Sequence, residues 1–146
     1  MVVEHEELTM LASANMEVFP DYQLRLRRGQ GCAGTAWERA VAASTYNFWR
    51  PVQATQTQLT KALLRRRWKL TEEQISRTAH ILWILSIPLF FRVGSRREFA
   101  GVLNFDGVHE PLRSPHRLMQ PDFIGQCVTL GDNLVDVAAA AGLLPR

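Results

Sequence analysis

The chain has 146 residues, of which 47% are hydrophobic, enough to build one self-standing core. Its formal charge of +3 is too small to indicate a nucleic-acid-binding protein by itself. Two cysteines, Cys32 and Cys127, exclude a disulfide framework and a paired-cysteine zinc site. Residues 1–10 carry acidic side chains where a secretory signal would carry basic ones, so no such signal is expected. The longest apolar run, residues 81–91, is too short to span a membrane. We therefore expect one domain over residues 1–146, cytoplasmic and without membrane insertion.

The N-terminal third predicts two strands, a glycine turn and a helix. Side chains alternate with a period of two over residues 8–12 and again over residues 22–27. Thr35 and Glu38 have the spacing of a capping box, which predicts a helix that begins at Thr35 and ends near Thr45. The segment after it, residues 46–57, is rich in aromatic side chains at first and has neither period, so it is predicted to be a loop.

Two helices are predicted next. A basic run within residues 57–68 accompanies leucines four residues apart, and Thr71 with Gln74 forms a second capping-box pattern. The run could contact a phosphate backbone, with Trp68 as a stacking platform. Because this basic density is not repeated along one face, we expect a solvated helix end and no nucleic-acid partner. The basic residues are Lys61, Arg65, Arg66 and Arg67 within this segment and Lys69 directly after Trp68.

Residues 83–107 are predicted to form the central hairpin of a sheet. Apolar residues alternate with other residues on both sides of a polar turn at residues 94–97, as expected of antiparallel strands. This pattern places Phe99 on the same face as Leu103 and Phe105.

A long helix is predicted at the C-terminal end. Pro121 and Asp122 suit its first turn, and Gly142 is placed to end it. Apolar residues recur at spacings of four and three, which predicts a buried stripe. The predicted stripe is Phe123, Cys127, Leu130, Leu134, Val137 and Ala141.

Three stretches together resemble GAF domains, a family of small-molecule sensors. They are LRLRRGQGCAGTAWE at 24–38, RTAHILWILSIPL at 77–89 and EFAGVLNFDG at 98–107. The resemblance implies an α+β fold with a central antiparallel sheet, helices on one side of it and a long C-terminal helix. The family usually has a helix and a strand before the point where this chain starts. We therefore expect the sheet to be a strand short, or residues 1–6 to supply a substitute edge.

The resemblance implies a sensory or regulatory, non-catalytic role in signal transduction. A pocket is expected between the sheet and residues 35–68, with aromatic walls and one cation. A helix N-terminus at Thr35 and the guanidinium of Arg50 would meet an anionic group of the ligand. The resemblance identifies neither the ligand nor any cofactor. The expected lining is Thr35, Trp37, Tyr46, Phe48, Trp49, Arg50 and Trp68.

The resemblance also favours a weak homodimer, since GAF relatives often pair through terminal helices. Ile124, Val128 and Val135 lie beside the predicted stripe of the last helix, and one helix in a single domain need not bury them. If the aromatic residues 46–49 fold onto the sheet and fill the pocket, the chain would be a ligandless dimerisation module instead.

Two catalytic or cofactor patterns are incomplete. Glycines 29, 31 and 34 spell GxGxxG, but no Asp or Glu lies between Glu38 and Glu72 to hold a ribose. Cys32 resembles the thiol of GAF-fold reductases of free methionine-R-sulfoxide, yet it stands one position early, with Ala33 at the matching site. Such a reductase remains an alternative, although we expect both cysteines to be small buried side chains. The four histidines lack metal-ligand spacing, so no metal is predicted.

Overall fold

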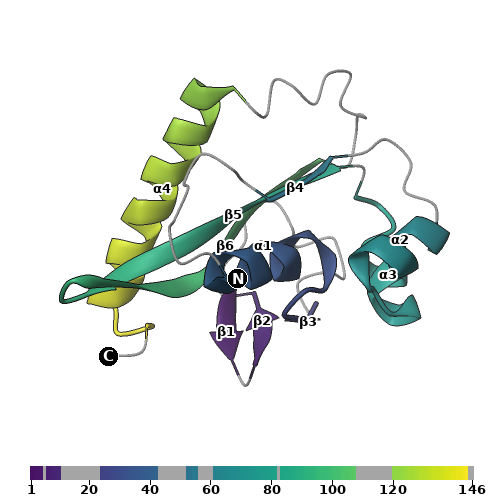
Figure 1. The fold of residues 1–146 in the computed structure, drawn as a ribbon, viewed down its shortest axis with the longest axis horizontal. Coiled ribbons are helices and arrows are strands. Elements are labelled where there is room, and N and C mark those ends of the chain that lie inside the picture. Colours follow the sequence, from purple (N-terminus) through teal and green to yellow (C-terminus); the bar gives the residue numbers. More distant parts are fainter. Residues whose placement is uncertain are drawn as a thin grey trace.

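A computed structural model describes residues 1–4, 6–10, 24–42, 52–55, 61–81, 83–107 and 120–144. These residues form an α+β fold with a six-stranded antiparallel sheet, in the order β3-β2-β1-β6-β5-β4 (Figure 1). The strands are β1 (Val2–Glu4), β2 (Glu7–Thr9), β3 (Leu26–Arg27), β4 (Val52–Thr55), β5 (Trp83–Val93) and β6 (Arg96–Gly107). The helices are α1 (Gly31–Ala42), α2 (Lys61–Trp68), α3 (Glu72–Arg77) and α4 (Pro121–Ala140). None of these helices is long and apolar enough to cross a membrane.

The predicted central hairpin is confirmed by β5 and β6. Its turn is tighter than predicted, because residues 96 and 97 already pair within the sheet and leave only Gly94 and Ser95 at the tip. A register shift between Leu89 and Phe90 introduces a β-bulge, which inverts the alternation of side chains beyond it. Phe99 therefore packs on the opposite core from Phe105, contrary to the prediction.

The N-terminal strands differ from the prediction. β1 lies between β2 and β6, where the Val102 N–H donates to the Met1 carbonyl at 2.8 Å, so residues 1–6 contribute an interior strand and not an edge. The sheet of the described residues has six strands. β2 ends at Thr9, and β3 retains two residues of the strand predicted over residues 22–27.

β4 lies within the segment predicted to be a loop. It forms one edge of the sheet, with Val52 opposite Ser86 and Thr55 opposite Trp83. The strand is only four residues long, which is too short for a period of two to be recognised in the sequence.

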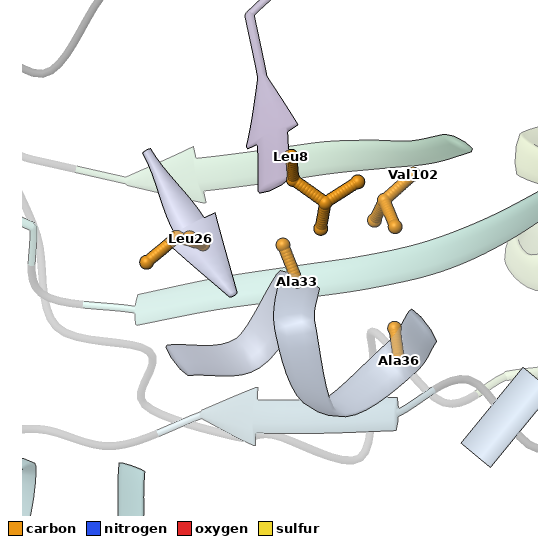
Figure 2. Close-up of a cluster of buried hydrophobic side chains, with 5 residues drawn as sticks. All are labelled: Leu8, Leu26, Ala33, Ala36 and Val102. Carbon is orange, nitrogen blue, oxygen red and sulfur yellow. The ribbon is translucent and has the colours of Figure 1, made fainter. Parts of the chain in front are cut away.

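Helices cover both faces of the sheet, so the expectation of helices on one side is wrong. On one face, Ala33 and Ala36 of α1 meet Leu8, Leu26 and Val102 (Figure 2). On the other face, Ile124 and Cys127 of α4 pack against Leu85 and Ile87. The consecutive residues 85–87 are all buried, which requires cover on both faces because neighbouring side chains of a strand point to opposite sides.

Helix ends set by local hydrogen bonds agree with the prediction. The Thr71 hydroxyl accepts from the Gln74 N–H at 3.2 Å, and the Gln74 side chain accepts from the Thr71 N–H at 2.8 Å. This capping box begins α3, which ends at Arg77. Pro121 occupies the first turn of α4, as predicted.

The buried face of α4 is rotated from the predicted stripe. Its buried residues are Ile124, Cys127, Gly131 and Val135, and Val128 packs against the same core. The residues predicted to form a dimer are therefore in the core. A Cβ at Gly131 would collide with the Leu89 side chain, so the helix packs closely against the hairpin at a residue without a side chain. Four residues of the predicted stripe are instead exposed: Leu130 (45%), Leu134 (44%), Val137 (66%) and Ala141.

Candidate functional site

A tight glycine turn places the start of α1. Gly29 and Gly31 adopt positive φ angles of 80° and 59°, and the Gly29 N–H donates to the Gly34 carbonyl at 2.8 Å. A Cβ at Gly34 would collide with the Arg27 carbonyl oxygen. These glycines therefore have the structural role of letting the chain turn and pack closely.

The predicted helix start at Thr35 is wrong. α1 begins at Gly31, so Thr35 is its fifth residue and lies beyond the first turn, where backbone N–H groups are free. The Thr35 hydroxyl donates to the Gly31 carbonyl at 2.6 Å, and the expected capping box with Glu38 does not form. Thr35 therefore cannot offer a free N–H to an anionic ligand.

Trp37 takes part in an aromatic group at one flank of α1. Its ring stacks on Phe99 with centroids 5.8 Å apart and planes 7° apart. Phe90 meets Phe99 edge-on, with centroids 6.2 Å apart. The bulge in the hairpin makes this possible, because it turns Phe99 toward α1.

Trp68 is the last residue of α2 and is only 7% exposed. It packs with Cys32, Leu64, Leu70 and Ile84, whereas Trp37 packs with a separate cluster. The Trp68 indole N–H is buried and has no hydrogen-bond partner among the described residues. An unpaired buried donor costs about 1–3 kcal/mol, so this group calls for an acceptor from elsewhere.

A buried polar pair lies on the same face of β5 as Ile84, which contacts Trp68. Ser86 is fully buried, and its hydroxyl donates to the Asn104 Oδ1 atom at 2.7 Å. The Asn104 amide in turn contacts the Met1 sulfur at 3.5 Å. The signal for this pair was present in the sequence, because the predicted hairpin brings residues 86 and 104 opposite each other.

The two thiols are buried on opposite faces of the sheet. Cys32 is 5% exposed in the first turn of α1, and Cys127 is 4% exposed in the α4 core. Burial raises the pKa of the Cys127 thiol, which disfavours its reactive thiolate. The described residues contain no group of three side chains suited to a metal ion.

The structure describes three of the seven residues predicted to line the pocket: Thr35, Trp37 and Trp68. It places Trp37 and Trp68 on the same face of the sheet but in separate clusters, and it puts Thr35 inside a helix. Tyr46, Phe48, Trp49 and Arg50 lie outside the described residues. An open depression is found elsewhere, on the outer side of α4, and its lining includes Asp122, Gln126 and Leu130.

Comparisons with protein-family models, curated proteins and solved structures found no match for this chain.

Proposed function

We propose that this chain is a non-catalytic sensory or regulatory domain, resembling GAF domains, that binds a small molecule on the α1 face of its sheet. The observation that carries the proposal is the buried indole N–H of Trp68, which has no partner among the described residues. A carbonyl, carboxylate or phosphate oxygen of a ligand would accept from this N–H. The polar pair of Ser86 and Asn104 on the same face adds hydrogen-bonding capacity.

A metabolite screen by thermal shift tests this proposal. A true ligand at a hundredfold excess over its Kd should stabilise the protein by about 2.7 kcal/mol. Trp68→Phe removes the N–H and should lose most of this stabilisation, while the control Trp37→Phe should keep it. Arg50→Ala should weaken an anionic ligand more than a neutral analogue. If no compound shifts the melting temperature, the ligandless module replaces the sensor.

We also propose a weak homodimer, through a different face of α4 from that predicted. Leu130, Leu134 and Val137 are exposed, and their spacing of four and three matches a coiled-coil seam. Gln126 and Asn133, which border them on the helix, are uncharged, so two such seams would meet without like-charge repulsion.

The reductase alternative predicts turnover that depends on Cys32. A sulfoxide would have to reach the Cys32 sulfur, and this residue is only 5% exposed. Sulfoxide reduction also oxidises the attacking thiol, and the sheet separates Cys32 from Cys127, so only an added dithiol could reduce it again. We therefore expect the protein to reduce free methionine sulfoxide no faster than its Cys32→Ser variant in a coupled assay with excess dithiol. A rate that disappears in the variant would instead establish the enzyme.

A further inference from the structure

The positive charge of the chain is concentrated in two stretches, residues 24–38 and 61–77. Together they hold nine basic and three acidic side chains, a formal charge of +6, whereas the whole chain carries +3. The remainder of the chain is therefore net negative. α4 contributes to that remainder with three aspartates and no basic residue. α4 and the pair α2 and α3 lie at opposite ends of the molecule (Figure 1).

Two glutamines bring the basic stretches together. The Gln74 amide donates to the Arg25 carbonyl at 2.7 Å, and the Gln30 amide donates to the Lys69 carbonyl at 3.2 Å. The two glutamine side chains also contact each other at 3.3 Å. The turn before α1 and the chain after α2 are thus joined, although 39 and 49 residues separate the bonded partners.

Several cations at this junction are not neutralised. Arg27 pairs with Glu7 at 3.3 Å, Arg77 pairs with Glu73 at 2.9 Å, and Arg65 pairs with Glu72. Five further basic residues are exposed and have no ion pair within the part of the chain that the structure describes. We call them the basic junction: Arg25, Arg28, Arg66, Arg67 and Lys69.

We propose that the basic junction binds the phosphate backbone of a nucleic acid without reading its sequence. The expectation of no nucleic-acid partner rested on a basic density confined to one run, and the fold places a second run beside it. Four of the five cations are arginines, whose guanidinium groups match phosphate oxygens in pairs. Base stacking has no part in this binding, because the Trp68 ring is buried and Arg67 lies 5.3 Å from its centroid.

The surroundings of the basic junction favour a nucleic acid over a membrane surface. Binding at a membrane interface combines cations with apolar side chains that insert between lipids. The exposed large apolar residues among the described ones are Val3, Val41, Val93, Leu130, Leu134, Val137 and Leu143, none of them in either basic stretch. The acidic α4 at the far end would also orient the molecule with the basic junction toward a polyanion.

The test is fluorescence anisotropy with a labelled 20-base-pair DNA duplex of arbitrary sequence, titrated with the full chain from 20 to 200 mM KCl. Five phosphate contacts predict a slope of about −4.5 for log K against log salt. Arg28→Gln with Arg66→Gln takes one cation from each stretch. It should flatten the slope by about 2 and weaken binding roughly 10- to 100-fold at low salt.

The matched control is Arg92→Gln with Arg96→Gln, an equal charge change on exposed residues beside the hairpin turn. It should leave the slope unchanged, and both double variants should keep the wild-type urea midpoint. Equal weakening by the two variants would reduce the effect to net charge and overturn the proposal. Two other results would also overturn the proposal. One is the absence of salt-dependent binding to the duplex. The other is binding to vesicles of phosphatidylglycerol and phosphatidylcholine without binding to the duplex.

Discussion

Val135→Glu should destabilise the protein by about 3–5 kcal/mol, because it buries a carboxylate without a partner in the core between α4 and the sheet. Val135 is 6% exposed, whereas the adjacent Leu134 is 44% exposed. At a concentration where the chain is monomeric, Leu134→Glu should therefore change the free energy of unfolding by no more than about 0.5 kcal/mol. Urea unfolding followed by tryptophan fluorescence measures both values. Greater destabilisation by Leu134→Glu than by Val135→Glu would show that the helix buries the face predicted from its stripe.

The same helix carries the test of the proposed dimer. Light scattering should show that the average mass of the wild-type chain rises with concentration. Leu130→Glu with Leu134→Glu places two charges on the exposed seam and should abolish this rise. Asp132→Glu is a suitable control, because it changes an exposed residue of α4 outside the seam. A wild-type protein that stays monomeric at every concentration would refute the dimer and leave the fold unaffected.

Gly34→Ala should destabilise the protein by about 1–3 kcal/mol, although alanine is ordinarily the better helix former by about 1 kcal/mol. The reason is the Arg27 carbonyl, which a Cβ at this position would strike. That carbonyl is backbone and also accepts from the Gln30 N–H at 2.9 Å, so it cannot move aside freely.

Gly125→Ala is the matched control for this substitution. Gly125 also lies within a helix, but an added Cβ would meet no atom within 4 Å. This variant should be more stable than the wild type by about 0.5–1 kcal/mol. Thermal unfolding of the two variants should thus give shifts of opposite sign. If Gly34→Ala is instead more stable than the wild type, the Arg27 carbonyl lies farther from residue 34 than the structure shows.

Features encoded by neighbouring residues were predictable from the sequence. The Thr71 and Gln74 side chains cap α3 through atoms three residues apart, and Pro121 needs only the first turn of its own helix. The hairpin of β5 and β6 was equally recognisable, since its alternation and its glycine turn lie within one continuous segment. These elements establish the α+β class without knowledge of any distant contact.

Features that depend on distant contacts were decided by the tertiary structure. α4 turns Gly131 toward the hairpin because a backbone without a side chain permits the closest approach, and a hydrophobic pattern gives glycine no weight. α1 begins at Gly31 because the turn packs against the Arg27 carbonyl, which overrides the cap expected at Thr35. The buried N–H of Trp68 and the basic junction arise from segments far apart in the chain, whose proximity no local periodicity records.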